Sequence, residues 1–277
     1  MANILPNTDG GLLTPDNCAV VFIDHQPQMT FGVANIDRQL LVNNVVMLAK
    51  GAKEYGVPVI LTAVETESFS GYIWPDLMDV FPGQQPVERS SMNSWDDEKF
   101  REAVKATGKR NIIIAGLWTE VCVAWPTLHL LAEGYNVYVV EDACGATSVA
   151  AHDAAMRRIV QAGAVPMTSV ATVLEFQRDW ANKEHYDAVL DIFRKHGGAY
   201  GDGIDYAYTM VHKAPQSAEN PHVVAELKDF NKIKQKIKRS VPIWVTPWLL
   251  RPPRAISQIF LFGEAKISAP GRVPRKC

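Results

Sequence analysis

The 277-residue sequence is poor in the features that mark several common protein classes. Its four cysteines are too few and too irregularly spaced for a disulfide framework or a paired-cysteine metal site. It contains no run of 18 consecutive apolar residues, so we expect no transmembrane segment. The first residues lack the basic and apolar regions of a secretory signal. We therefore expect a cytoplasmic protein.

Phosphate-binding and metal-binding motifs are lacking as well. No G-x-G-x-x-G follows an expected strand, and Gly108-Lys109 has neither the first glycine nor the Ser/Thr of a P-loop. The seven histidines show no metal-ligand spacing. The sequence thus predicts neither a cofactor nor a bound metal, and leaves a small-molecule substrate as the expected ligand.

Charge is divided unevenly along the chain. Residues 221–277 carry 12 Lys/Arg and 3 Asp/Glu, whereas residues 1–220 carry 16 Lys/Arg and 27 Asp/Glu. An acidic body argues against a nucleic-acid partner, because neutralising phosphates requires clustered Lys and Arg. We predict a domain over residues 1–217 and a basic, Pro-rich, poorly ordered extension over 218–277. The extension is either a segment that touches a membrane surface or partner, or one without selected structure.

Short apolar runs alternate with amphipathic stretches in the first part of the chain. Unbroken apolar runs are typical of strands buried on both faces, and strands spaced by helices form parallel βαβ units. The sequence therefore predicts a three-layer α/β/α sandwich with a mostly parallel, Rossmann-like central sheet. The expected strands span residues 19–24, 57–64, 111–116, 136–140 and 164–168, and the expected helices 36–55, 96–107, 121–133 and 148–161.

Two candidate catalytic residues lie at carboxyl ends of expected strands, where open α/β sheets bind ligands. Asp24 follows the first apolar run, and Cys122 follows NIIIAGLWTEV, at the expected first turn of a helix. There the helix dipole would lower the pKa of the Cys122 thiol, and unpaired N–H groups could bind an oxyanion. The alternative is a small buried cysteine and a turn-forming aspartate.

Three stretches resemble the motifs of the isochorismatase-like cysteine hydrolases. AGLWTEVCV over residues 115–123 is similar to the family signature G-x-x-T-x-x-C-V. VVFIDHQ over 20–26 resembles the family's first strand and its acid, and YVVEDA over 138–143 the strand after the nucleophile helix. The wider similarity covers residues 12–212 and is closest to the YcaC-like branch, through residues 93–96 and 104–109.

The resemblance implies a catalytic Asp, Lys and Cys, which correspond here to Asp24, Arg89 and Cys122. An arginine can stabilise a thiolate or a carboxylate but cannot shuttle protons, so Asp24 would carry the proton transfers alone. The alternative for Arg89 is a surface ion pair with Glu88 or Asp96. The residues predicted to bind the oxyanion or substrate are Thr119, Trp118, Gln26, Phe31, Trp95 and Trp125, with core packing as the alternative for the aromatic ones.

The resemblance also implies a non-proline cis peptide between Trp118 and Thr119. Residues 62–68 lack the histidines of the nicotinamidase metal set, and true isochorismatases lack the cysteine, so neither a metal nor isochorismate is expected. Our first hypothesis is a cysteine hydrolase that cleaves a small amide-like or carbamoyl-like C–N bond through a thioester. The second is a non-catalytic binding or assembly protein that retains the fold. A homo-oligomer is expected, with interface aromatic residues among Trp180, Phe193, Tyr200, Tyr206 and Tyr208.

Overall fold

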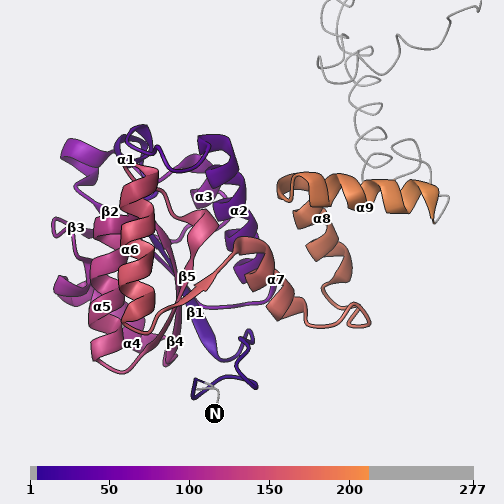
Figure 1. Cartoon of the computed structure of the whole chain (residues 1–277), viewed down its shortest axis with the longest axis horizontal. Coiled ribbons are helices and arrows are strands. Elements are labelled where there is room, and N and C mark those ends of the chain that lie inside the picture. The colour runs from indigo at the N-terminus through magenta and orange to yellow at the C-terminus, as the bar shows by residue number, and fades with distance from the viewer. Residues whose placement is uncertain (1–4, 212–277) are drawn as a thin grey trace, which may run out of the picture. The chain divides into compact units, whose positions relative to one another are not determined.

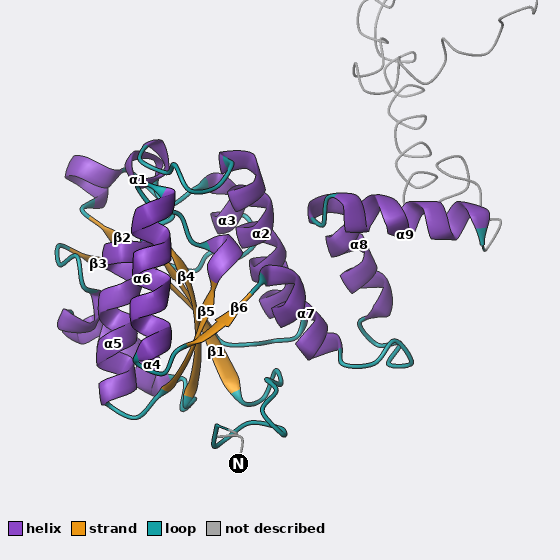
Figure 2. Cartoon of the chain, in the orientation of Figure 1, coloured by secondary structure: helices purple, strands orange, loops and turns teal. Residues whose placement is uncertain are grey.

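The computed structural model describes residues 5–211. Its centre is a six-stranded sheet in the order β3-β2-β1-β4-β5-β6 (Figures 1 and 2). Each neighbouring pair in this sheet is parallel, so the carboxyl ends of the strands lie at one edge. The strands are β1 (Cys18–Ile23), β2 (Val59–Val64), β3 (Val87–Arg89), β4 (Asn111–Gly116), β5 (Asn136–Val140) and β6 (Val165–Met167).

Helices cover both faces of this sheet (Figure 1). One face carries α2 (Arg38–Glu54) and α7 (Ser169–Gln177). The opposite face carries α4 (Glu98–Ala106), α5 (Ala124–Ala132) and α6 (Val149–Gln161). The remaining α-helices of the described part are α1 (Pro27–Phe31), α3 (Pro75–Met78), α8 (Tyr186–His196), which packs against α2, and α9 (Ala199–Met210).

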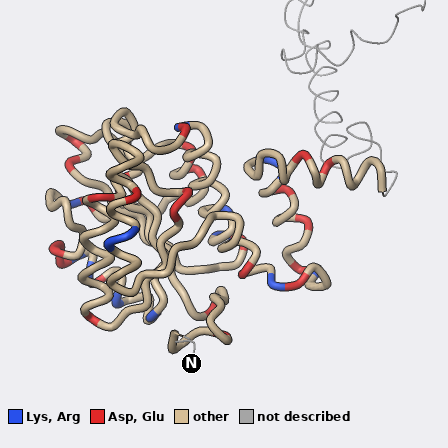
Figure 3. Tube along the Cα trace, in the orientation of Figure 1, with Lys and Arg blue, Asp and Glu red and all other residues tan. Residues whose placement is uncertain are grey.

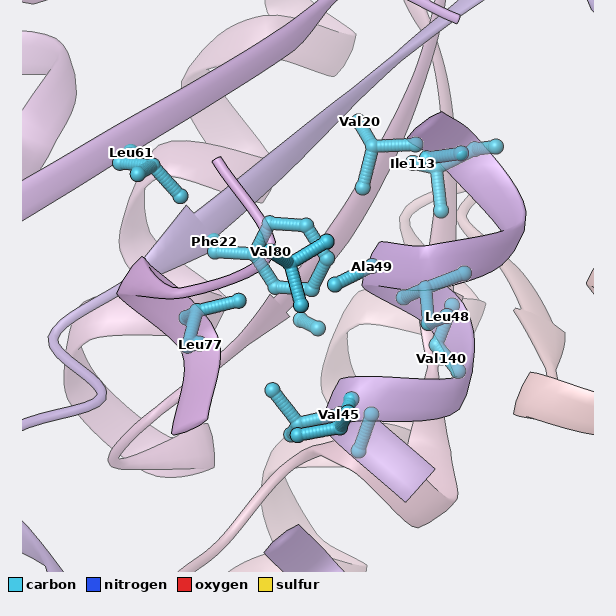
Figure 4. Close-up of a cluster of buried hydrophobic side chains, with 14 of the residues drawn as sticks. Val20, Phe22, Val45, Leu48, Ala49, Leu61, Leu77, Val80, Ile113 and Val140 are labelled. Atoms are coloured by element: carbon cyan, nitrogen blue, oxygen red, sulfur yellow. The ribbon is translucent and has the colours of Figure 1, made fainter. Parts of the chain in front are cut away.

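Strand β1 is buried on both faces, and its alternate side chains enter two different cores. Phe22 packs into the cluster beneath α2 and α3, together with Val45 and Leu77 (Figure 4). Val21 and Ile23 pack into the cluster beneath α4, α5 and α6. Because both faces are covered, the strand is apolar at every position and shows no polar alternation.

The predicted fold class is confirmed, and most local predictions hold within a few residues. The strands over 111–116 and 136–140 have the expected bounds, and the Ser148 hydroxyl caps α6 by accepting the N–H of Ala151 at 3.0 Å. The helix expected from Val121 is wrong at its start. Thr119–Val123 forms a single π-helical turn, and α5 begins only at Ala124.

Strand β3 has three residues, too short to give a periodic signal in the sequence. The predicted boundary at residue 217 and the predicted extension lie outside the described residues. Among residues 5–211, no helix is both long and apolar enough to cross a membrane. Acidic residues outnumber basic ones in this part and are scattered over helices and loops (Figure 3).

Candidate active site

Asp24 and Cys122 come from the two strands that flank the switch point of the sheet. From β1 the chain continues to β2 on one side, and from β4 it continues to β5 on the other. The crevice at such a reversal is where open α/β sheets bind ligands. Asp24 follows β1, Cys122 lies in the π-helical turn after β4, and the two side chains are hydrogen-bonded. The fold thus brings the predicted base and nucleophile together.

The backbone at Asp24 is in the left-handed region, with φ at 56°. This conformation costs a non-glycine residue about 1 kcal/mol, although aspartate tolerates it better than most. It closes a tight turn in which the N–H of Gln26 donates to the carbonyl of Asp24 at 2.7 Å. The Asp24 N–H still continues the sheet by donating to Thr62 O at 3.0 Å. The turn fixes the carboxylate at the sheet edge.

Arg89, at the end of β3, reaches across β2 to Asp24. Its Nη2 lies 2.6 Å from both carboxylate oxygens, and both side chains are fully buried. Its Nε donates to Thr62 Oγ1 at 3.2 Å, and its Nη1 donates to the carbonyl of Ser91. The surface ion pair considered for Arg89 is therefore wrong. Glu88 instead accepts hydrogen bonds from the backbone and hydroxyl of Thr66.

Burial dominates the electrostatics of the Asp24 carboxyl. Removal from water raises its pKa to about 6, while the charge and hydrogen bonds of Arg89 and the hydrogen bond with Cys122 act in the opposite direction. A carboxylate with a pKa in this range can accept a proton near neutral pH and return it in a later step.

The Cys122 thiol has a raised pKa, contrary to the sequence prediction. Burial is the main cause, and the negative charge of Asp24 adds to it, whereas Arg89 and the backbone N–H of Trp118 oppose it. The predicted helix-dipole effect is reduced because α5 begins two residues after Cys122. At neutral pH the site holds a thiol beside a carboxylate, so a nucleophile arises only when Asp24 takes the proton.

Thr119 anchors the nucleophile turn but does not present its N–H to a ligand. That N–H donates to the carbonyl of Gly145 at 2.8 Å, so its predicted role as an oxyanion donor is wrong. The buried hydroxyl lies 3.1 Å from the same carbonyl and 2.9 Å from Nδ1 of His152. The N–H of Trp118, by contrast, is directed at the Cys122 sulfur.

Gln26 is a structural clamp. Its amide nitrogen donates to Val64 O at 3.0 Å and to Gly71 O, and its amide oxygen accepts the N–H of Val64 at 3.0 Å. The side chain is completely buried, and these bonds join the end of β1 to the end of β2. Gln26 therefore supports the turn at Asp24 instead of facing a substrate.

The aromatic candidates separate into two groups. Half-buried Trp118 donates from its indole to Met29 O of α1 at 2.7 Å. Phe31, the last residue of α1, is 72% exposed. The cis peptide bond joins Leu117 to Trp118, one residue before the expected place. The first group, Trp118 and Phe31, thus belongs to α1 and to the segment after β4 that contacts it.

Trp95 is buried in the core beneath α4, α5 and α6, and the partly buried Trp125 packs against this core. The Trp95 ring makes edge contacts with Phe100 and Tyr135, and its indole donates to Glu133 at 2.8 Å. Glu133 follows the last residue of α5, whereas Cys122 precedes the first one. The structure thus places Trp95 at the opposite end of α5 from the candidate nucleophile.

Sequence reasoning missed Thr62 and His152. Thr62 links the Arg89 guanidinium to the backbone of β3, since its hydroxyl donates to Val87 O at 2.8 Å. His152 contacts Thr119 from α6. Its position four residues after the N-cap Ser148 placed it at the helix end nearest the sheet edge, a signal available in the sequence. Within residues 5–211, no group of three or more His, Cys, Asp or Glu side chains is arranged to hold a metal.

Comparison with known proteins identifies related chains. The isochorismatase domain family matches residues 18–171. Probable hydrolase YcaC of Escherichia coli is 38% identical over 185 residues, which are 66% of this chain and 88% of that protein.

Two solved structures resemble the fold. YcaC from Pseudomonas aeruginosa, with hexane-2,5-diol and covalent acrylamide, aligns with a TM-score of 0.68 and 38% identity over 72% of this chain and 98% of that one. Escherichia coli YcaC, described as an octameric hydrolase of unknown specificity, aligns with a TM-score of 0.68 and 36% identity, over 72% and 97% of the two chains.

Proposed function

Since this chain belongs to the isochorismatase family, in its YcaC-like branch, we propose that this hydrolase cleaves a small amide-like or carbamoyl-like C–N bond through a thioester on Cys122. The hydrogen-bonded pair of Asp24 and Cys122 at the switch point of the sheet carries the proposal. Cys122 is only 5% exposed, so its sulfur is accessible only to a small substrate that presents its carbonyl group directly.

In the first half-reaction, Asp24 takes the thiol proton as the Cys122 sulfur attacks the carbonyl carbon. The C–N bond then breaks, and Asp24 returns the proton to the leaving nitrogen, which departs as ammonia or an amine. In the second half-reaction Asp24 takes a proton from water, which attacks the thioester. The C–S bond breaks, the thiol is re-formed with that proton, and the carboxylic acid leaves.

Arg89 has a fixed electrostatic role in this scheme. It keeps its charge throughout, and its contacts with both Asp24 oxygens hold the carboxylate in place. As the proton moves from sulfur to Asp24, the carboxylate loses its charge and the sulfur gains one. The guanidinium then stabilises whichever group is negative. This supports a proton relay in which the arginine itself never exchanges a proton.

The assembly expected for the protein is a homo-oligomer, by analogy with octameric Escherichia coli YcaC. Tyr200 and Tyr206 of α9 are 43% and 62% exposed and supply apolar surface for such an interface. Phe193 is fully buried and packs on Tyr200, so it supports α9 from within. A single monomeric species in light scattering at micromolar concentration would overturn this expectation.

The decisive experiment screens the wild-type protein against small primary amides, ureido acids and short esters. It follows ammonia or acid release and looks for an acyl adduct by intact mass. Cys122→Ala and Asp24→Asn are the test variants, and Cys144→Ala is the matched control, since Cys144 is a buried cysteine outside the pair. We expect turnover and adduct in wild type and control only. Unchanged turnover in Cys122→Ala would refute the mechanism, and no turnover or adduct in any protein would favour the binding or assembly hypothesis.

A further inference from the structure

We propose that His152 is a positioning residue that holds the nucleophile turn in place through the hydroxyl of Thr119. The inference rests on the proposed role of Cys122 and adds a residue to that site. His152 lies on α6, and its Nδ1 is 2.9 Å from Thr119 Oγ1. Thr119 is the first residue of the π-helical turn that carries Cys122. The contact therefore joins α6 directly to the segment that presents the sulfur.

The Thr119 hydroxyl depends on this contact because it is fully buried. Its single proton has two acceptors in reach, the carbonyl of Gly145 at 3.1 Å and Nδ1 of His152 at 2.9 Å. In one arrangement the Thr119 hydroxyl donates to the Gly145 carbonyl and accepts a hydrogen bond from the imidazole. In the other the hydroxyl donates to the imidazole, and the carbonyl still accepts the N–H of Thr119. In both arrangements the ring and the hydroxyl are bonded, so loss of the imidazole removes a buried hydrogen bond.

Both nitrogens of His152 are placed for polar contacts, which distinguishes it from a residue that only fills space. Nε2 lies 3.5 Å from Oε1 of Glu141, a side chain that is half exposed, while the His152 ring itself is buried. The ring therefore lies between Glu141, which directly follows β5, and Thr119, the first residue of the nucleophile turn.

A second set of contacts, between Glu120 and Thr147, also holds the nucleophile turn. Glu120 accepts hydrogen bonds from the N–H of Thr147 at 3.1 Å and from its hydroxyl at 2.6 Å. Gly145 donates to the carbonyl of Gly116 at 3.2 Å, at the end of β4. The segment from Gly145 to the N-cap of α6 thus makes hydrogen bonds with both Thr119 and Glu120, the first two residues of the turn. Because a single π-helical turn is a rare departure from the α-helix, contacts from neighbouring segments help to fix its shape.

The test compares two amide replacements that separate the two nitrogens of the imidazole. The amide of His152→Asn reaches the place of Nδ1 and keeps a partner for Thr119. The amide of His152→Gln extends to the place of Nε2 and leaves Thr119 without one. If His152 only packs, the larger Gln should be the better substitute, whereas the proposal predicts that Asn is. We expect His152→Gln to lower kcat by about 10- to 100-fold with KM little changed, and His152→Asn to stay close to wild type.

A second readout does not need a substrate. Alkylation of Cys122 by iodoacetamide is followed against pH, because loosening the turn moves the sulfur away from Asp24 and toward water. The pH midpoint should then fall in His152→Gln and remain at the wild-type value in His152→Asn. Equal midpoints and equal kcat in the two variants would overturn the proposal. Thr119→Val gives the same test from the other partner, and its effect should not add to that of His152→Gln.

The two proposals fail in distinguishable ways. Turnover that survives Cys122→Ala refutes the mechanism, while the alkylation profile still shows whether His152 positions the turn. Turnover that is lost in Cys122→Ala, with Asn and Gln at position 152 indistinguishable, refutes only the role of His152. If neither variant at position 152 folds, a wild-type alkylation profile in Thr119→Val overturns the role and a shifted one supports it.

Discussion

A single nitrogen of Arg89, Nη2, contacts both carboxylate oxygens of Asp24 at 2.6 Å in the interior of the protein. The remaining guanidinium donors are directed at Thr62 and at the carbonyl of Ser91. Arg89 is thereby held by the ends of β2 and β3, and it cannot leave Asp24 without breaking other buried bonds. The ion pair is a fixed part of the site, which gives removal of Arg89 a predictable cost.

Arg89→Met is expected to lower both stability and activity. It leaves the Asp24 carboxylate buried without its partner, which typically costs about 3–5 kcal/mol. The pKa of Asp24 should rise further, so the base is protonated at neutral pH and turnover is lost. Urea unfolding at pH 7.5 and activity on the substrate found above measure the two effects. Arg157→Met, at an exposed position of α6, is the control and should change neither. A loss of stability below about 1 kcal/mol, the value of exposed pairs, would contradict the assignment.

The activity should depend on pH through the ionisation of Asp24. Its pKa is raised to about 6, mainly by burial, and only the carboxylate can accept the thiol proton. We therefore expect kcat/KM to rise with pH through an apparent pKa near 6. Initial rates between pH 4.5 and 8 measure this limb, and a limb centred near pH 4, the value of an exposed aspartate, would disagree with a buried base.

The same ionisation predicts how stability changes with pH. A raised carboxyl pKa means that the folded protein binds more protons than the unfolded chain between about pH 4 and pH 6. The contribution of Asp24 to the free energy of unfolding is therefore full below pH 4 and is lost as the pH rises through 6. Comparing wild type with Asp24→Asn over this range isolates the contribution, since Asn does not titrate. A difference between the two proteins that is constant with pH would contradict it.

Asp24→Asn should make Cys122 more acidic while it abolishes hydrolysis. Burial raises the pKa of Cys122 and the charge of Asp24 raises it further, whereas Arg89 lowers it. The substitution removes the negative charge and leaves the guanidinium beside the sulfur. We expect the pH midpoint of Cys122 alkylation to fall. Asp153→Asn, on the exposed face of α6, should leave the midpoint unchanged. A midpoint that stays or rises in Asp24→Asn would show that the two side chains do not interact as described.

The sequence predicts the sheet well because buried parallel strands have a local signature. The runs at 111–116 and 136–140 each begin with an asparagine and are otherwise without charged or strongly polar residues, and covered faces leave no polar alternation to confuse their bounds. Asp24 and Cys122 follow from the same reasoning, since each comes just after such a strand. Their meeting is a consequence of strand order, which places β1 beside β4.

The parts that sequence reasoning misses depend on contacts between distant segments. The pKa of Cys122 follows from burial and from Asp24, 98 positions away in the chain, and it overrides the local effect of the helix. Because it lies two residues after Asp24, Gln26 is predicted to bind substrate, yet its amide nitrogen donates to the backbone carbonyls of Val64 and Gly71. The sequence places His152 near the start of α6 but does not show its contact with Thr119, because the path of that turn is determined only by the fold.

Gln26→Leu should destabilise the protein strongly, because the Gln26 side chain is completely buried and hydrogen-bonded. It leaves the N–H of Val64 and the carbonyls of Val64 and Gly71 without their side-chain partner in the interior. Each buried group left unsatisfied costs about 1–3 kcal/mol, so we expect a loss of several kcal/mol. Chemical unfolding measures it, with Gln39→Leu on the exposed face of α2 as the matched control. Wild-type stability in Gln26→Leu would show that the clamp contributes nothing.

Removing residues 218–277 is expected to leave hydrolysis and thermal stability unchanged. The family match ends at residue 171, and the alignment with Pseudomonas aeruginosa YcaC uses 98% of that chain but only 72% of this one. The candidate site is built wholly from residues before 153. The opposite charge of residues 221–277 could attract them to the acidic body, but exposed ion pairs contribute only about 0–1 kcal/mol each and are screened by salt. Turnover, melting temperature and oligomer size of a chain ending at residue 217 measure the three properties. A smaller oligomer with intact turnover would assign the segment to assembly, while loss of turnover would place part of the catalytic apparatus in it and refute the predicted division of the chain.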